Sequence, residues 1–233
     1  IENHFDKSFE LEATLEKRVK RATLKEIRAI SKLNISMQSI RQGEAKGLGH
    51  AILCSKRLIG KEPFAVILPD MLISKVKGNA GDSFKKMRLN FEKYKISSVL
   101  LGKAKKKDIP KYGIAQIKNN SQLPGFGLIE KIIEKPSVKK APSNLYAVGR
   151  YIFNNNFFEY LSNVKPDKSN EIQLTDAIDD YIKDKNKVNA FSLEGDIFDC
   201  GDNADYILAN LEFAMRNPSM ETKIKNYLKT KLF

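Results

Sequence analysis

Hydrophobic and polar positions repeat with two periods along the first half of the chain. Residues 8–30 carry apolar side chains at mostly helical spacing between charges, which predicts one or two amphipathic helices. Further on, short apolar runs alternate with segments of helical period. This alternation predicts an α/β fold with a parallel or mixed sheet and crossover helices. The expected strands are 34–41, 63–70 (buried) and 96–104, and the expected helices are 44–59 and 83–94.

The second half begins with three strand patterns that no long helix separates. They predict a mixed or antiparallel extension of the sheet, over 112–118, 128–136 and 145–153. Helices follow at 155–164, 171–184 and 203–233, with a strand at 188–195. Neither a repeat nor a clear linker interrupts the chain, so we expect one domain over 1–233, with carboxyl-terminal helices from about 203.

Composition narrows the classes of partner. The longest apolar runs are too short to span a bilayer, which favours a cytoplasmic protein with no membrane partner. A net charge of +13 makes nucleic acid a legitimate hypothesis. The lysines, however, are mixed with glutamates and have few aromatic neighbours, a pattern that a solvated surface explains about as well. We therefore expect no nucleic-acid partner and keep a basic nucleic-acid-binding protein as an alternative.

Two aspartates stand where a hard cation could bind. Asp70 ends the most hydrophobic strand pattern, and ligands bind at the carboxyl edge of open α/β sheets. Carboxylate and phosphate oxygens are the ligands that Mg²⁺ prefers, although an aspartate that caps a turn fits equally well. Asp199, in "FDCGDN", is a candidate second metal ligand, whereas Asp202 is typical of a turn or a helix cap.

Two further motifs lie at predicted strand ends. In "YGIAQIK", Gly113 could let a polyhydroxylated ligand approach the backbone, although a β-bulge is the commoner explanation. In "IIEKP", Glu134 could accept hydrogen bonds from sugar hydroxyls while Lys135 neutralises a phosphate. The alternative for this pair is a charged strand end in water.

The segment "RQGEAKGLGHAIL", residues 41–53, contains three glycines between a strand pattern and a helix pattern. Glycines at such a junction allow either a sharp turn or a close approach of the main chain to a ligand. A turn followed by a helix start is the simpler interpretation.

The order of the motifs is more specific than any one of them. "QGEAKGLGHA", "VILPD", "YGI", "EKP", "NLYAVGRY", "NEIQLTDAI" and "DCG" together resemble the bacterial UTP–glucose-1-phosphate uridylyltransferase family of sugar-phosphate nucleotidyltransferases. The resemblance covers nearly the whole chain. It implies a Rossmann-like nucleotidyltransferase fold, with a central mixed, mainly parallel sheet flanked by helices.

The resemblance also implies a reaction. The phosphate oxygen of glucose 1-phosphate attacks the α-phosphorus of UTP, and pyrophosphate leaves, with Mg²⁺ as cofactor. By this resemblance, Gln42 and Gly47 contact the uracil base, and Asp70 binds Mg²⁺. Gly113 and Glu134 contact the glucosyl group, and Lys135 contacts its phosphate. Asp199 corresponds to the second metal-binding aspartate of sister enzymes.

The family pattern opens with a strand and a glycine-rich loop that bind the triphosphate, and neither motif is found in these 233 residues. The expectation is therefore an amino-terminally truncated chain that lacks them. A non-catalytic UDP-sugar-binding remnant is the corresponding alternative. Since family members are usually dimers or tetramers, we also expect a homo-oligomer.

Overall fold

The computed structural model describes the chain except for residues 1–4, 6, 34, 76–77, 119–126 and 233. It separates into two compact units, residues 1–43 and 44–233. The first unit contains two helices, α1 (Phe9–Lys17) and α2 (Arg21–Ser31), which confirms the helices predicted over 8–30. Leu15 and Leu24 are buried in this unit. The expectation of a single domain over 1–233 stays a prediction.

The strand predicted over 34–41 is wrong. Residue 34 lies outside the described residues, and residues 35–41 form neither a helix nor a strand. The apolar side chains of this segment, Ile35, Met37 and Ile40, are exposed. A strand needs a hydrogen-bonded neighbour, and no described strand pairs with this segment.

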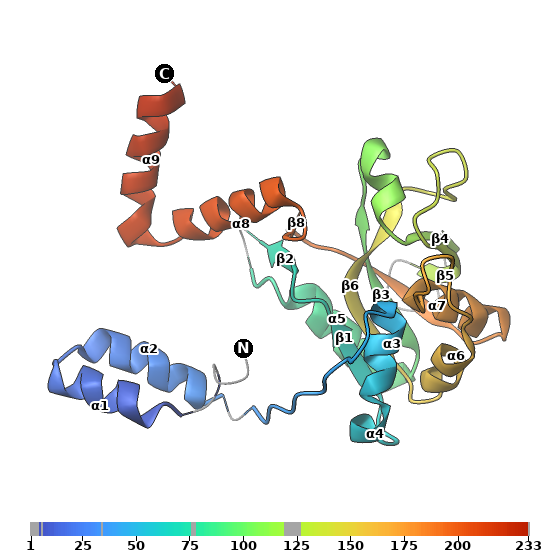
Figure 1. Cartoon of the computed structure of the whole chain (residues 1–233). Coiled ribbons are helices and arrows are strands. Elements are labelled where there is room, and N and C mark those ends of the chain that lie inside the picture. Colours follow the sequence, from blue (N-terminus) through green and yellow to red (C-terminus); the bar gives the residue numbers. More distant parts are fainter. Residues whose placement is uncertain (1–4, 6, 34, 76–77, 119–126, 233) are drawn as a thin grey trace. The chain divides into compact units, whose positions relative to one another are not determined.

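The second unit alternates helices and strands before it ends in two helices (Figure 1). Its elements are α3 (Gly47–Cys54), α4 (Lys56–Ile59), β1 (Phe64–Ile67), β2 (Met71–Ser74), α5 (Asp82–Tyr94), β3 (Ser97–Lys103), the 3₁₀-helix η2 (Lys106–Lys111), β4 (Ile114–Lys118), β5 (Gly127–Ile133), β6 (Leu145–Phe153), α6 (Phe157–Asn163), α7 (Leu174–Lys183), β7 (Val188–Ser192), β8 (Asp196–Asp199), α8 (Asn203–Met215) and α9 (Pro218–Leu232).

A mixed sheet forms the centre of the second unit, which confirms that part of the expected fold. Its described strands lie in the order β1-β6-β3-β7-β5-β4. The expectation of mainly parallel pairing is wrong, because β3–β7 is the one parallel pair among these strands. β1, β3, β4 and β7 share one direction, but β6 runs the opposite way between β1 and β3. β5 runs the same way as β6, and these two strands together make most neighbouring pairs antiparallel.

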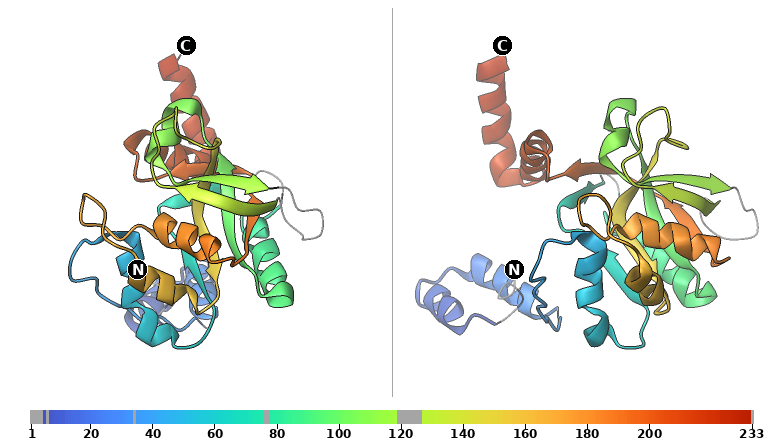
Figure 2. Two further views of the ribbon diagram at one scale, coloured as in Figure 1. Left: turned by 90° about the vertical axis from the view of Figure 1, so that its right-hand side faces the viewer. Right: turned by 45° about the vertical axis from the view of Figure 1, so that its right-hand side comes forward.

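Helices cover both faces of this sheet (Figure 2). One core contains residues of α3, α6 and α7 together with Val99 and Leu101 of β3. The other contains Met87 and Phe91 of α5 together with Leu100. Successive residues of a strand point to opposite faces, so β3 contributes to both cores. β1 departs from the expected buried strand, since it is the edge strand of this order and its Ile67 is exposed.

The sequence pattern missed a small second sheet. β2 and β8 pair antiparallel, with Met71 opposite Asp199. Each strand has four residues, too few for a clear alternation of apolar and polar positions. α8 then begins at Asn203, as predicted, and the Asp202 side chain caps it by accepting hydrogen bonds from two backbone N–H groups. In the part of the chain that the structure describes, no helix combines the length and apolar character needed to cross a membrane.

Candidate active site

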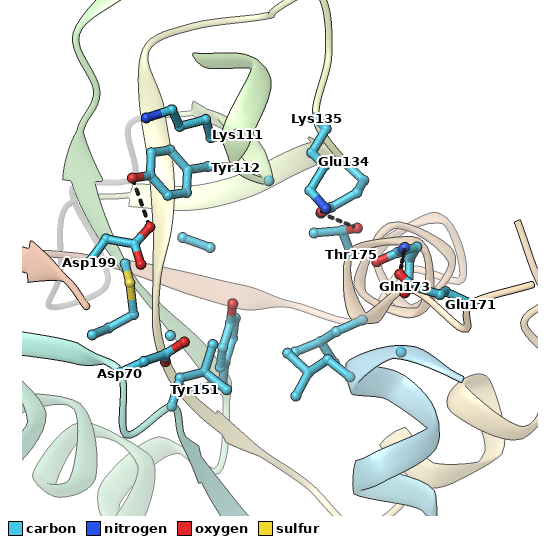
Figure 3. A pocket seen from close by; sticks show the side chains of 18 residues that line it. Asp70, Lys111, Tyr112, Glu134, Lys135, Tyr151, Glu171, Gln173, Thr175 and Asp199 are labelled. Carbon is cyan, nitrogen blue, oxygen red and sulfur yellow. Dashed lines mark hydrogen bonds and ion pairs between the residues drawn. The ribbon is translucent and has the colours of Figure 1, made fainter. Parts of the chain in front are cut away.

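A cavity of about 430 Å³ lies in the second unit and brings together most of the predicted site residues (Figure 3). These residues come from segments far apart in the sequence: Gly47, Asp70, Gly113, Glu134, Lys135 and Asp199. Gln42 belongs to the first unit, so its assignment to the nucleotide base stays a prediction. The lining mixes apolar side chains with carboxylates and two lysines, Lys111 and Lys135.

The pairing of β2 with β8 brings the two candidate metal ligands to one end of the cavity. Asp70 lies in the turn between β1 and β2, and Asp199 is the last residue of β8. The Cys200 N–H donates to the Asp70 carbonyl at 2.9 Å, which ties the two segments together. In Figure 3 both aspartates lie on the same side of the cavity.

Tyr112 and Lys111 lie near this acidic end. The Tyr112 hydroxyl donates to Asp199 Oδ2 at 3.1 Å, and the Gly201 N–H donates to Asp199 Oδ1 at 3.1 Å. Burial, together with the charge and hydrogen bond of Asp199, raises the pKa of Tyr112. The phenol therefore stays protonated at neutral pH and acts as a donor. Asp199 is thus held in one orientation.

Glu134 lies at the other side of the cavity, against the start of α7 (Figure 3). Its Oε2 accepts a hydrogen bond from the Thr175 hydroxyl at 3.0 Å. Burial raises the pKa of the Glu134 carboxyl, while the hydrogen bond from Thr175 and the charge of Lys135 lower it. The result is a partly buried carboxylate with one oxygen hydrogen-bonded by the protein.

Gly113 packs against the side chains of Glu134 and Thr175. A Cβ at this position would lie 2.5 Å from Thr175 Cγ2 and 3.2 Å from Glu134 Oε2. The β-bulge interpretation does not hold at this residue, because the irregularity of β4 falls between Gln116 and Ile117. The missing side chain lets Thr175 reach Glu134 across the backbone.

Lys135 follows Glu134 in a left-handed backbone conformation with φ of 41°. Such a conformation is strained for a residue with a side chain, and strain of this kind gathers at functional sites. The Lys135 N–H donates to the Tyr112 carbonyl at 3.1 Å, and Lys135 Nζ lies 3.8 Å from Glu134 Oε1. With its side chain 57% exposed, the ammonium group can reach a bound phosphate.

Two glycines of "QGEAKGLGHA", Gly47 and Gly49, have a structural explanation within the chain itself. Gly47 has a φ of +82°, and a Cβ there would lie 2.9 Å from Glu171 Cβ. A Cβ on Gly49 would lie 2.6 Å from the Ile172 carbonyl oxygen, which accepts the Gly49 N–H. The start of α3 therefore packs directly on the segment before α7. Gly47 also lines the cavity, so its backbone is accessible to a ligand there as well.

Several lining residues carried no assignment from the sequence, among them Lys111, Tyr112, Glu171, Gln173 and Thr175. The contacts of Tyr112 with Asp199 and of Thr175 with Glu134 join segments far apart in the sequence, so spacing along the chain could not reveal them. The available signal was the stretch "SNEIQLTDAI", which contains three of the five.

The carboxylates that line the cavity fit a hard cation that also binds substrate. Among the described residues, no group of three or more His, Cys, Asp or Glu side chains could enclose a metal. Four carboxylates line the cavity, and two of them, Asp70 and Asp199, lie together on one side of it. Mg²⁺ is usually held by one or two carboxylates together with substrate phosphates and water, so this pair is sufficient.

Comparison with known proteins places these features in a family. A family model described as nucleotidyl transferase matches residues 11–216. The chain belongs to this family. Nucleotidyl transferases of this kind generally use a divalent metal.

Similar curated proteins of the nucleotidyl transferase family are UTP–glucose-1-phosphate uridylyltransferases. The protein of Haemophilus ducreyi is 42% identical over 231 residues, which are 98% of this chain and 78% of that protein. The protein of Escherichia coli strain K12 is 39% identical over 234 residues, covering 100% of this chain and 76% of that protein. These matches confirm the resemblance drawn from the motifs.

Solved structures agree with the fold. A UTP-bound UGPase from Acinetobacter baumannii has a TM-score of 0.84 and 35% identity, covering 98% of this chain and 77% of that one. A UDP-glucose pyrophosphorylase complexed with UDP-glucose has a TM-score of 0.79 and 36% identity, covering 93% and 76%.

Proposed function

We propose that this nucleotidyl transferase transfers the uridylyl group of UTP to glucose 1-phosphate. A phosphate oxygen of glucose 1-phosphate attacks the α-phosphorus of UTP, the bond from that phosphorus to the bridging oxygen breaks, and pyrophosphate leaves. The observation that carries the proposal is one cavity lined by Asp70, Asp199, Lys135 and the partly buried Glu134, in a chain whose relatives carry this activity by name. No covalent intermediate with the protein is needed.

The acidic end of the cavity is proposed to bind the phosphates. Asp70 and Asp199 would hold Mg²⁺, which neutralises phosphate charge when bound. Lys135 would contact the phosphate of glucose 1-phosphate and keep its attacking oxygen in line. Catalysis of this kind depends on positioning and on neutralisation of crowded negative charge.

The Glu134 side is proposed to bind the sugar. Desolvated carboxylate oxygens accept strong hydrogen bonds from hydroxyl groups, and Thr175 occupies only one of the two oxygens of Glu134. Gly113 would leave room for the sugar ring beside this carboxylate. Gln42 and Gly47 are proposed to contact the uracil base, Gln42 through its amide and Gly47 through its backbone.

Two further expectations belong to the same proposal. A homo-oligomer, dimeric or tetrameric, and a cytoplasmic location are what we infer for an enzyme of this class. A UDP-sugar-binding protein without turnover is the competing function, and it predicts UDP-glucose binding without release of pyrophosphate.

The exchange Lys135→Ala tests the phosphate contact. We expect kcat/KM for glucose 1-phosphate to fall about 100-fold, the usual cost of removing one group that stabilises charge in the transition state. Lys139→Ala removes an exposed lysine four residues away that does not line the cavity, and should leave the rate unchanged. The measurement is the initial rate of pyrophosphate release. Equal rates for the Lys135→Ala and wild-type proteins would remove Lys135 from the mechanism.

A further inference from the structure

The turn that carries Asp70 is held by a side chain from the neighbouring strand. Arg150 lies in β6, and its Nη1 donates to the Leu68 carbonyl at 2.8 Å and to the Gly149 carbonyl at 3.0 Å. Its Nη2 donates to the Met71 carbonyl at 2.7 Å. The planar guanidinium therefore bridges both ends of the turn that contains Asp70.

The same turn is packed tightly on β6. The Leu68 N–H donates to the Gly149 carbonyl at 2.9 Å, and a Cβ on Gly149 would lie 2.9 Å from Leu68 Cβ. Burial lowers the pKa of Arg150, and the nearby Asp70 carboxylate opposes this effect. The charge of Arg150 is thus balanced by three carbonyl dipoles and by Asp70.

Arg150 does not touch the space that substrate would fill. The described lining of the cavity includes its neighbours Gly149 and Tyr151 but not Arg150 itself. Its hydrogen bonds to Leu68 and Met71 connect it instead to the turn that carries Asp70.

We infer that Arg150 is a positioning residue that fixes the Asp70 turn and so sets the affinity of the acidic end for a divalent cation. The inference rests on the proposed function, in which Asp70 is a metal ligand. Second-layer groups that orient metal ligands typically change metal affinity by about 10- to 100-fold when they are replaced. A lysine cannot substitute, since a single ammonium group does not reproduce the planar fork that reaches both Leu68 and Met71.

The test compares Arg150→Lys and Arg150→Met with Arg88→Met. Arg88 pairs with Glu92 on an exposed helix surface and is the matched control. Binding of Mn²⁺ in the presence of UTP is titrated by electron paramagnetic resonance, and pyrophosphate release is measured against Mg²⁺ concentration. We expect half-saturating Mn²⁺ and Mg²⁺ to rise about tenfold in both Arg150 variants. The KM for glucose 1-phosphate should change less than about twofold, and Arg88→Met should match the wild type.

A second pair of variants separates positioning from a general loss of structure. In the Asp70→Asn background, Arg150→Lys should cause no further loss of Mn²⁺ affinity, because the residue through which it acts is gone. Arg150→Lys keeps the charge and most of the volume, so the Mn²⁺ titration can be made with this variant if Arg150→Met does not fold.

Two results would overturn the inference. One is a folded Arg150→Lys protein with wild-type Mn²⁺ affinity. The other is a wild-type protein that binds no Mn²⁺ with UTP. A wild-type protein that binds Mn²⁺ with UTP but releases no pyrophosphate would instead refute the proposed function, and the Mn²⁺ titration would still decide the role of Arg150.

Discussion

At the scale of single residues, the environment of Glu134 determines what its carboxylate can do. Burial favours the protonated form, whereas the Thr175 hydroxyl and Lys135 favour the ionised form. Since the ionised carboxylate is the better acceptor for sugar hydroxyls, Thr175 keeps Glu134 usable at lower pH.

The exchange Thr175→Val tests this balance with little change of shape. Without the hydroxyl, the pKa of Glu134 rises further, so the protonated form persists to higher pH. We expect the acid limb of the kcat/KM profile for glucose 1-phosphate to move to higher pH, with KM at neutral pH up about tenfold. Thr175→Ser keeps the donor and is the control. Superimposable pH profiles for the Val, Ser and wild-type proteins would contradict the role of Thr175.

Gly47 gives a second prediction for a single residue. An alanine at its φ of +82° is strained, and its Cβ would lie 2.9 Å from Glu171 Cβ. We expect Gly47→Ala to lower the free energy of unfolding by about 1–3 kcal/mol without any ligand present, measured by thermal unfolding. Gly43→Ala is the control, because nothing lies within 4 Å of a Cβ there. If Gly47→Ala affects only UTP binding, the packing explanation is wrong.

The sequence predicted some of these residues for a physical reason. Asp70, Glu134 and Lys135 stand where strand patterns end, and strand ends carry ligand sites in α/β folds. Tyr112 and Thr175 were missed because their partners, Asp199 and Glu134, are 87 and 41 residues away. Contacts over such separations depend on the topology, which spacing alone does not give.

At the scale of elements, an aromatic cluster joins α6 to the sheet and to α7. The rings of Phe153 and Phe157 stack with centroids 3.8 Å apart, and Tyr181 meets Phe157 edge-on at 5.5 Å. Phe157 is fully buried. Because Leu174 and Thr175, the first two residues of α7, line the cavity, this cluster also supports one of its walls.

The exchange Phe157→Ala should therefore be costly. A buried phenylalanine replaced by alanine typically lowers the free energy of unfolding by about 3–5 kcal/mol, and we expect a value in this range from denaturant unfolding. Phe9→Ala removes a ring that is 70% exposed and should cost far less. A loss for Phe157→Ala as small as that expected for Phe9→Ala would mean that the aromatic cluster does not stabilise the second unit.

Helices and strands were predicted correctly where the apolar pattern was long. They were missed or wrongly predicted where the pattern was short or where the segment has no neighbouring strand to pair with. The helical period over 8–30 was sufficient to predict α1 and α2. The four-residue strands β2 and β8 left no readable alternation, although their pairing brings Asp70 near Asp199. The direction of β6 could not be predicted either, because apolar runs indicate burial and not the neighbour with which a strand pairs.

At the scale of the whole molecule, the cavity depends on the arrangement of the second unit. Segments from α3 to β8 contribute to its lining, and the antiparallel strand β6 passes behind it with Arg150. The sequence motifs that resemble the family are distributed over these same segments. This explains why their order was informative when each motif alone was weak.

The central claim is that the protein makes UDP-glucose, and the most direct measurement is the rate of pyrophosphate release by the purified wild-type protein with UTP, glucose 1-phosphate and Mg²⁺. UDP-glucose is quantified in the same samples. We predict that pyrophosphate and UDP-glucose appear in equal amounts, and only when both substrates are present. UDP-glucose binding with no release of pyrophosphate would contradict the claim and favour a protein that binds the sugar nucleotide without turnover.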